Sequence, residues 1–419
     1  MLYYYFGLVW YNCLMFDLSS PTTYIPTIFL ILVGAFVSYL WKDARKNTHE
    51  HTWELPYFDE IALSMNYINR NIHPDGRFQY RHNVDPEITY KNDVYNSLRH
   101  AGTLYAMYEY EKVGLETKFK DNRLLASKYF IDRYVRSLDD TRYVVVSLPE
   151  EEGIKFHIAK SGAAGVGLCA LCNLYEEKEI DLPILRGLGE FILSMTDEDG
   201  NVWAYYNLET NEIDKEAEAI FYPGEAAAGL FCLYEIDPQQ KWLDAIMKII
   251  MNIVHTRKHM DLEIPFDHWS VMVIKNLLYK LLVKDPADAD EMRAYAEQMA
   301  IPVLSNQITN PKNSYYGGFI DNIRPCSLGT VMEGLAYIYY CTENEQLKMI
   351  INKALSIGNY FLARVQVKTG IHAGGLPNSA NWVKPGVTPN ASIIRIDNVQ
   401  HVVLGWLRYQ SILKITGKY

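Results

Sequence analysis

Polar and charged side chains stand at the start of six segments that are otherwise apolar. Each segment follows a loop, so these groups lie where a loop meets the next element. Binding and catalytic residues are concentrated on loops that a rigid scaffold positions. We therefore expect one site that contains Arg99, His100, Tyr222, Glu225, Asp267, His268, Trp269, Asp321, Arg324, Arg395, Asp397, Gln400 and His401, with Glu333 further along its segment.

The carboxyl groups of this set suit acid–base chemistry on a saccharide. Glycoside hydrolysis needs one carboxyl group as acid and a second as base or nucleophile. Glu225 and Asp397 are the preferred pair, and Asp267 is the next candidate. The spacing along the chain selects no pair, because the three acids belong to different segments. Each also has a structural alternative, since the helix dipole favours a carboxylate in the first turn of a helix.

The histidines of the set suit a second chemistry. His100, His268 or His401 could act with a tyrosine to move a proton next to a carboxylate, as epimerisation and β-elimination require. His401 could instead be a hydrogen-bonded histidine of the core. A third interpretation has no catalysis: a membrane-tethered saccharide-binding or assembly protein of envelope polysaccharide metabolism. Such a protein would keep its function after Glu225→Gln, whereas an enzyme that needs this acid would not.

Arginine and aromatic residues indicate what a ligand would look like. Arg99, Arg324 and Arg395 favour an acidic saccharide, because guanidinium groups bind carboxylates and phosphates through paired hydrogen bonds. Arg99 could instead pair with Asp93. Aromatic rings near DG and GG turns could stack on sugars or could pack the loops against one another, and this group comprises Trp203, Tyr205, Tyr206, Tyr315, Tyr316 and Trp382.

A regular alternation of two kinds of helix must position these residues. Amphipathic stretches with a period of 3.6 are predicted at 58–72, 122–138, 182–195, 240–254, 288–305 and 344–365. Between them stand stretches that are apolar nearly all round, such as SGAAGVGLCALCNLYE and PGEAAAGLFCLYE. A helix that is apolar on every side must be buried on every side. The alternation predicts an all-α fold, an (α/α)6 toroid with six outer and six inner helices, in residues 49–419. An open solenoid is the rival, but the loops before the inner helices are long and those after them are short.

Composition excludes several classes of function. The net charge of −10 and the lack of a basic block argue against a nucleic-acid partner. The six cysteines form no disulfide framework, and the C-x-x-C of Cys169 and Cys172 lies inside an apolar helical stretch. No phosphate-binding glycine loop or dinucleotide motif occurs, so we expect no nucleotide cofactor. No ligand cluster has metal-binding spacing, and we predict no metal.

The N-terminus carries a predicted membrane anchor in residues 1–48. Residues 25–41 form an uncharged run, IPTIFLILVGAFVSYLW, and residues 22–24 extend it to the length a bilayer requires. Lys42, Arg45 and Lys46 follow the span directly. The positive-inside rule then favours a cytoplasmic location for the main domain. Protein partners and oligomeric state cannot be deduced.

Residues 50–419 resemble the six-hairpin glycosidase-like superfamily. The resemblance rests on the alternating helices and on the loop sequences DGRF, DEDGNVW, YPGEAA and DHW. It implies a carbohydrate-active enzyme, and the superfamily includes glycoside hydrolases, sugar epimerases and polysaccharide lyases. Hydrolysis is the leading expectation, with epimerisation, elimination and simple binding as alternatives. The resemblance identifies no single family, because one fold serves many reactions.

Overall fold

In the computed structural model, the structure describes residues 56–417 except 85–93, 115–118, 321–322 and 383–388. The chain divides into two compact units, Met1–Leu55 and Pro56–Tyr419, and the described residues belong to the second. The predicted membrane span at 22–41 and the boundary at 48/49 lie outside the described residues, so both stay predictions. Within the described part of the chain, no helix has the length and apolar character needed to cross a membrane.

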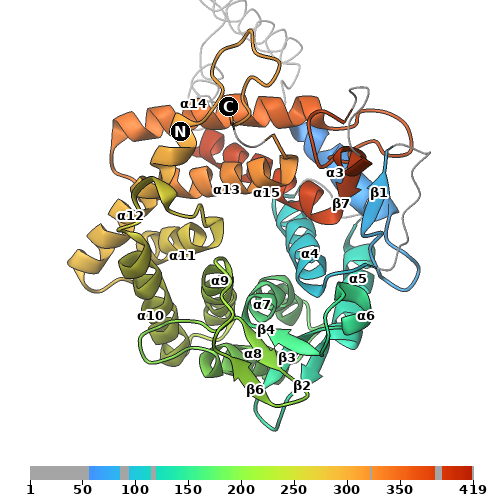
Figure 1. The fold of residues 1–419 in the computed structure, drawn as a ribbon, viewed down its shortest axis with the longest axis vertical. Helices are drawn as coiled ribbons and strands as arrows, with labels where there is room; N and C mark the ends of the chain where they lie inside the picture. The colour runs from blue at the N-terminus through green and yellow to red at the C-terminus, as the bar shows by residue number, and fades with distance from the viewer. Residues whose placement is uncertain (1–55, 85–93, 115–118, 321–322, 383–388, 418–419) are drawn as a thin grey trace, which may run out of the picture. The chain divides into compact units, whose positions relative to one another are not determined.

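Twelve helices of the described residues form two concentric rings, as the alternation predicts (Figure 1). The outer helices are α3 (Phe58–Arg70), α5 (Lys120–Tyr134), α8 (Leu182–Ser194), α10 (Gln240–Arg257), α12 (Pro286–Ser305) and α14 (Glu345–Val365). The inner helices are α4 (Ser97–Lys112), α7 (Ser161–Glu176), α9 (Tyr222–Ile236), α11 (His268–Tyr279), α13 (Pro325–Cys341) and α15 (Ile396–Ile415). The predicted (α/α)6 toroid is confirmed.

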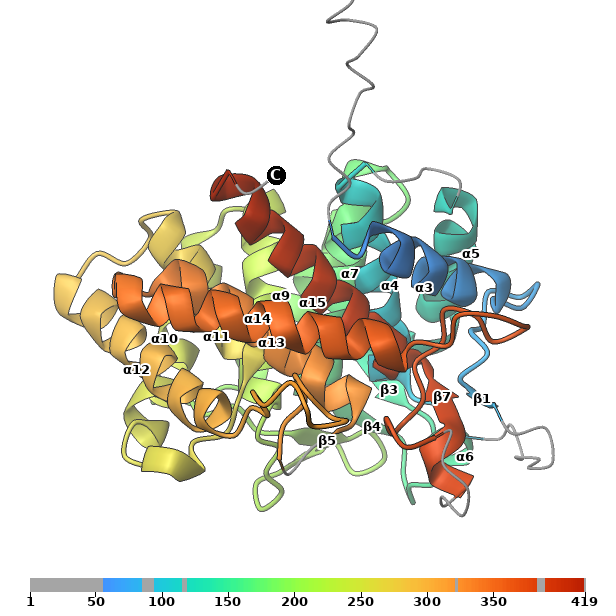
Figure 2. The ribbon, with the colours of Figure 1, turned by 90° about the horizontal axis from the view of Figure 1, so that it is seen from above.

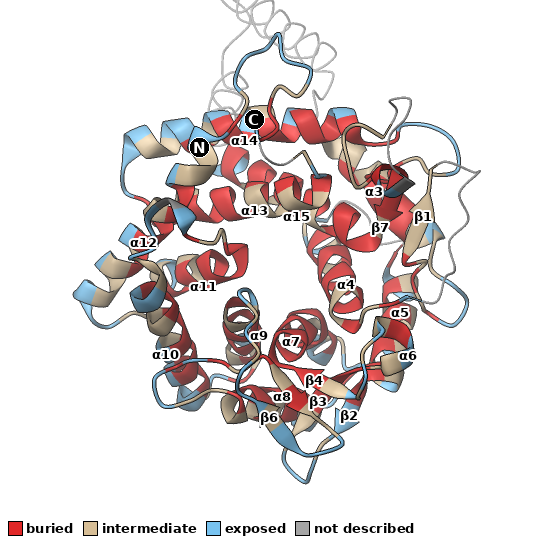
Figure 3. Ribbon diagram, viewed as in Figure 1, coloured by how far each residue is buried: buried red, intermediate tan, exposed pale blue. Residues whose placement is uncertain are grey.

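Burial follows the two classes of helix. The inner helices are buried on most sides, while the outer helices expose one face to solvent (Figure 3). Glycine permits the closest approach between inner helices. A Cβ atom on Gly229 of α9 would lie 2.4 Å from the Cα of Gly165 in α7. A larger residue at either position would therefore push the two helices apart.

Short strands in the long loops are the main departure from an all-α fold. β2 (Val135–Ser137), β3 (Tyr143–Ser147), β4 (Ile158–Lys160), β5 (Tyr205–Asn207) and β6 (Glu212–Asp214) form an antiparallel sheet in that order. β1 (Arg81–Asn83) pairs with β7 (Ile393–Arg395), which brings the first and last loops together. The predicted helix at 122–138 is wrong at its end, because residues 135–137 pair with β3.

The loops give the ring two unlike faces. The strands, the short helices α6 (Pro149–Glu152), η1 (Asp261–Glu263) and η2 (Pro389–Ser392), and the long loops precede the inner helices. Figure 2 shows the labelled strands and α6 on one side of the ring and the C-terminus on the other. The N-terminal ends of all the inner helices therefore open toward the elaborated face. That face is where the sequence places its polar groups.

Candidate active site

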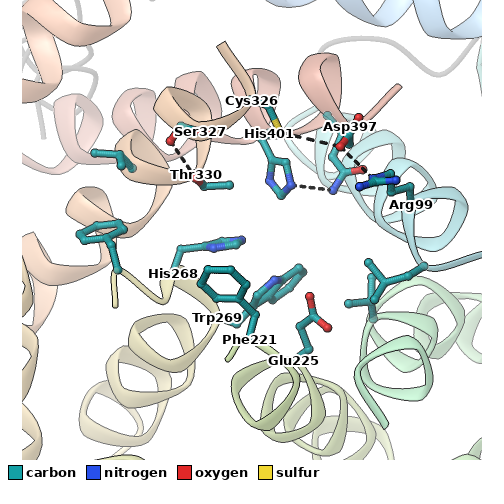
Figure 4. A pocket seen from close by; sticks show the side chains of 15 residues that line it. Arg99, Phe221, Glu225, His268, Trp269, Cys326, Ser327, Thr330, Asp397 and His401 are labelled. Carbon is teal, nitrogen blue, oxygen red and sulfur yellow. Dashed lines mark hydrogen bonds and ion pairs between the residues drawn. The ribbon is translucent and has the colours of Figure 1, made fainter. Parts of the chain in front are cut away.

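A cavity of about 450 Å³ lies where the inner helices begin (Figure 4). Its walls combine aromatic rings with ionisable groups and come from α4, α7, α9, α11, α13 and α15. The residues that line it include Arg99, Phe221, Glu225, Phe266, His268, Trp269, Cys326, Ser327, Thr330, Asp397, Gln400 and His401. Such a mixture is typical of small-molecule pockets, in which a few polar groups orient a ligand between apolar walls.

One wall of the cavity holds two histidines above a buried glutamate. His268 Nε2 lies 3.9 Å from Glu333 Oε2, and His401 Nδ1 lies 3.8 Å from the same oxygen. The imidazole rings are nearly perpendicular, with centroids 5.3 Å apart. Among the described residues, none of these three atoms has a hydrogen-bond partner. Buried polar atoms are almost always paired in folded proteins, so three that face one another indicate a site prepared for a ligand.

Burial and charge set the protonation of this wall. Burial lowers the pKa of His268 to about 4, although the nearby carboxylate of Glu333 opposes the shift. Burial alone would raise the pKa of Glu333. The rings of His401 and His268, together with the positive charge of Arg408, bring the pKa of Glu333 below its usual value instead. The wall therefore presents a neutral imidazole beside a carboxylate.

A chain of hydrogen bonds supports Glu333 from the side away from the cavity. The hydroxyl of Tyr337 donates to Glu333 Oε1 at 3.4 Å and accepts a hydrogen bond from Arg408 Nε at 2.8 Å. Arg408 also donates to the Tyr105 hydroxyl at 2.9 Å and forms an ion pair of 2.5 Å with Glu109. These later turns of the inner helices line a second cavity of about 460 Å³. Tyr337 and Arg408, which support Glu333, thus line this second cavity.

A second group of charges in the first cavity is fully paired. Asp397 Oδ1 accepts from Arg395 Nε at 2.5 Å, and Oδ2 accepts from Arg395 Nη2 at 2.7 Å. Arg99 Nε lies 2.9 Å from Oδ2, and the Cys326 thiol lies 3.8 Å from it. Burial would raise the pKa of Asp397, but the two arginines lower it below the usual value. Both oxygens of Asp397 are therefore occupied by the protein itself.

Glu225 is an isolated acid on the other side of the cavity from His401 in Figure 4. It is 6% exposed, and its Oε2 has no hydrogen-bond partner among the described residues. Burial raises the pKa of Glu225 to about 8, with a further contribution from the charge of Asp267. Glu225 is consequently protonated near neutral pH and can donate a proton.

The structure brings some of the predicted site residues into the cavity and places others outside it. The residues in its lining are Arg99, Glu225, His268, Trp269, Asp397, Gln400 and His401. Those outside the lining are His100, Tyr222, Trp203, Asp267, Arg324, Trp382 and Arg395. Asp321 lies outside the described residues.

Two of the predicted site residues outside the cavity have structural roles. Asp267 is fully buried and caps α11, with Oδ1 accepting from the backbone nitrogens of Trp269 and Ser270 at 3.2 Å each. Its Oδ2 pairs with Arg257 at 3.0 Å. His100 is fully buried and lies between the Tyr95 hydroxyl, at 2.7 Å, and the carbonyl of Ala126, at 2.9 Å. These contacts argue against a catalytic role for Asp267 and against a substrate-binding role for His100.

The other predicted site residues that lie outside the cavity lining belong to the loops and their junctions with the helices. Trp203 packs under Lys215, and Tyr222 packs edge to face against Tyr205. Trp382 packs against the core, and Arg324 stands at the start of α13, exposed to solvent. Arg395 forms an ion pair with Asp397. Phe221, Phe266 and Thr330 line the cavity without having been predicted, because apolar and hydroxyl residues carry no distinctive signal in a sequence.

Glu333 was assigned no role from the sequence. It stands in the middle of the inner helix α13, beyond the helix start that the other candidates share. The signal for it in the sequence was a carboxylate in an otherwise apolar helix. In the structure this carboxylate has no exposed surface. The two imidazole nitrogens and its oxygen lie within 4.8 Å of one another and can hold a metal ion. Two nitrogens and one carboxylate oxygen are ligands that transition metals accept.

Comparison with known proteins places this architecture. No family model matches the sequence, and no curated protein matches it either. Among solved structures, a D-mannose isomerase is similar over 86% of this chain and 100% of its own, with a TM-score of 0.63 and 10% identity. The cellobiose 2-epimerase of Bacillus thermoamylovorans is similar over 83% of this chain and 98% of its own, with a TM-score of 0.60 and 13% identity.

A third similar structure is an α-1,6-mannanase of Salegentibacter, over 85% of this chain and 99% of its own, with a TM-score of 0.57 and 10% identity. The protein has the six-hairpin (α/α)6 toroid fold of these three structures. Identities this low establish the fold of the toroid alone. Its reaction must be argued from the cavity.

Proposed function

We propose that this toroid is a sugar isomerase or epimerase that moves a proton at the carbon next to a sugar carbonyl. One observation carries the proposal: His268 and His401 present unpartnered ring nitrogens beside the carboxylate of Glu333 in the wall of the cavity. A positioned imidazole is the commonest general base and acid in enzymes. The fold is shared with a D-mannose isomerase and a cellobiose 2-epimerase, which supports the same class of substrate.

The chemical step needs only groups that the cavity supplies. One imidazole removes the proton from C2 of the open-chain aldose, and the C–H electron pair forms the C1=C2 bond of an enediolate while the carbonyl oxygen takes the negative charge. Return of a proton to the other face of C2 restores the C1 carbonyl and gives the epimer. The ketose forms when the O2 hydroxyl proton passes to O1, the C2=O bond forms and the imidazole returns its proton to C1. The carboxylate of Glu333 stabilises whichever imidazole has become positive. Glu225, which is protonated near neutral pH, can donate a proton to the sugar ring oxygen during ring opening.

The cavity favours a neutral sugar of one or two rings. Arg99 and Arg395, which would have bound an acidic saccharide, are both engaged by Asp397. Trp269, Phe221 and Phe266 offer apolar faces for a sugar ring. A volume of about 450 Å³ is near the small end of ligand pockets, which span roughly 300–1,000 Å³. The acidic substrate expected from the arginines is therefore replaced, in this proposal, by a neutral one.

Glycoside hydrolysis is the second candidate, and the raised pKa of Glu225 favours it. A protonated carboxyl group is the general acid that hydrolysis needs. The partner is the difficulty, because both oxygens of Asp397 are already bound by Arg395 and Arg99. A carboxylate held in this way has no free oxygen with which to attack a sugar or activate water. We therefore rank proton transfer above hydrolysis.

A deuterium exchange experiment separates the two candidates. The full-length protein is incubated in D₂O with D-mannose, D-glucose or cellobiose, and proton NMR follows the C2 hydrogen while mass spectrometry follows the products. Proton transfer predicts loss of the C2 signal and an isomeric product, both abolished by His268→Asn and by His401→Asn. Cleavage of cellobiose into two hexoses, whose summed mass exceeds that of cellobiose by one D₂O, would support hydrolysis if these variants cleave it as well. An isomer formed without deuterium would contradict transfer through a histidine.

A further inference from the structure

Three potential metal ligands meet at the wall of the cavity: His268 and His401 line it, and the buried Glu333 lies beside them. His268 Nε2 and His401 Nδ1 lie 3.9 and 3.8 Å from Glu333 Oε2, and all three atoms lie within 4.8 Å of one another. His268 is 6% exposed and Glu333 is fully buried. Within the described residues, the three atoms have no hydrogen-bond partner and point into the same small space. Figure 4 shows His268 and His401 near each other in the wall of the cavity, and their ring planes are nearly perpendicular.

We propose that His268, Glu333 and His401 form a reversible binding site for a divalent transition metal ion, and that the bound ion switches the enzyme off. The proposal rests on the function proposed above, because it assigns a regulator to the same side chains. Metal binding itself depends only on the three ligands, so it can be tested whether or not the protein converts sugars.

The ligand set selects the class of ion. Calcium and magnesium bind mainly oxygen ligands, whereas zinc, cobalt, nickel and copper accept imidazole nitrogen. Zinc bonds to nitrogen and carboxylate oxygen are about 2.0–2.2 Å long, so neighbouring tetrahedral ligands lie roughly 3.4 Å apart. The observed separations of 3.8 and 3.9 Å exceed this by about half an ångström. The two ring nitrogens lie within 4.8 Å of each other, so the rings must also move toward one another to close the site around an ion.

The surroundings of the three ligands suit a bound ion. Glu333 Oε1, the oxygen that points away from the histidines, accepts from Tyr337, and Arg408 in turn fixes that hydroxyl. Hydrogen bonds behind a ligand fix its orientation and strengthen metal binding. On the other side His268 and His401 line the cavity, so water can complete the coordination. The arrangement has three protein ligands and an open position, as in zinc sites that exchange their fourth ligand.

Occupation of the site stops proton transfer. A metal ion takes the nitrogen lone pairs of His268 and His401, which are the lone pairs that accept and return the proton. It also takes Glu333 Oε2, which otherwise stabilises the imidazolium. Sugar and metal therefore compete for one set of atoms, and metal should raise the apparent KM or abolish turnover in proportion to occupancy.

A second histidine pair provides a matched control. His82 and His372 have ring centroids 5.1 Å apart, about the same separation as in the proposed site. His82 Nδ1 is already bonded to the Tyr67 hydroxyl at 2.7 Å. Among the described residues, only His268, Glu333 and His401 form a group of three such ligands. His372→Asn therefore removes an imidazole from a similar pair without touching the proposed site.

Cobalt titration of the full-length protein tests the site directly. Co²⁺ is added to metal-free protein while visible absorption is followed, and Zn²⁺ binding is measured by calorimetry. We expect one ion per chain, release by EDTA, and affinity at least tenfold lower in Glu333→Gln and His401→Asn but unchanged in His372→Asn. Circular dichroism establishes that each variant is folded.

The outcomes separate this proposal from the function on which it rests. Absence of saturable binding to folded wild-type protein, or equal binding by Glu333→Gln, would overturn the metal site. Stoichiometric binding that depends on the three residues establishes the site even if no sugar shows C2 exchange. Exchange that continues with the site saturated by Zn²⁺ would refute the inhibitory effect while leaving the enzyme proposal intact.

Discussion

Two groups of charged side chains share one cavity and differ in whether their atoms already have partners. Asp397 is bound by Arg395 and Arg99, so every oxygen is occupied within the protein. The group of His268, Glu333 and His401 leaves three buried atoms without partners among the described residues. A buried unpaired polar atom costs about 1–3 kcal/mol, which a protein retains only where the atom has another use. The difference indicates that the first group holds the loops and the second acts on a ligand.

The largest expected effect follows from removing one imidazole of the unpaired group. His268→Asn keeps a polar side chain but has no group that can take a proton near neutral pH. General acid–base catalysis contributes about 10²–10⁴-fold, so we expect C2 exchange to fall about 10³-fold. The melting temperature should change by only a few degrees. Exchange kinetics by NMR and thermal unfolding measure the two quantities, and a loss of exchange matched by unfolding would contradict the assignment.

The opposite result is expected in the paired group. Asp397→Asn leaves Arg395 and Arg99 without their counter-charge. Breaking a fully buried ion pair costs about 3–5 kcal/mol, and the partial exposure of the arginines lowers this to about 2–3 kcal/mol. Chemical denaturation should show that loss, while exchange per folded molecule falls less than tenfold. A folded Asp397→Asn protein with no exchange would instead place Asp397 in the chemistry and revive hydrolysis.

Glu225 tests whether an unpaired buried acid also makes the stability of the protein depend on pH. Its pKa of about 8 exceeds the unfolded value, so the native state holds a proton that the unfolded chain releases. Stability is therefore full below about pH 4.5 and is lost as pH rises through 8. Glu225→Gln removes this loss. From pH 6 to pH 7 the free energy of unfolding of the variant, relative to that of wild type, should therefore rise by about 1.4 kcal/mol. Denaturation of both proteins at pH 5, 6, 7 and 8 measures the slope, and parallel curves would contradict the raised pKa.

The same comparison explains how far the sequence could lead. The ring was predictable, because helix amphipathicity and the alternation of long and short loops are properties of neighbouring residues. Which candidates enter the cavity was only partly predictable. His100 and Asp267 stand at helix starts like the lining residues, but their side chains meet Tyr95 and Arg257 instead.

Contacts between side chains of different hairpins could not be predicted from the sequence. Asp397 ranked among the leading acids because of its place before an inner helix, yet Arg99, almost 300 residues away, occupies one of its oxygens. Glu333 had no assigned part, and its position between two histidines of other helices depends on closure of the ring. These distances are set by the packing of α4, α11, α13 and α15, which no local pattern records.

The smallest expected effect concerns the support behind the unpaired group. Tyr337→Phe removes the hydroxyl that links Arg408 to Glu333, so the carboxylate loses a hydrogen bond that fixes it beneath the histidines. One such bond is worth about 1 kcal/mol, and we expect kcat to fall about fivefold with KM unchanged, because Tyr337 lies outside the cavity lining. Tyr105→Phe is the matched control: its hydroxyl also accepts from Arg408, at 2.9 Å, but donates toward Met272 rather than to Glu333. Both variants should lose similar stability in denaturation, while only Tyr337→Phe slows turnover. If the two slowed it equally, Arg408 would matter through packing alone, and Glu333 would need no support from behind.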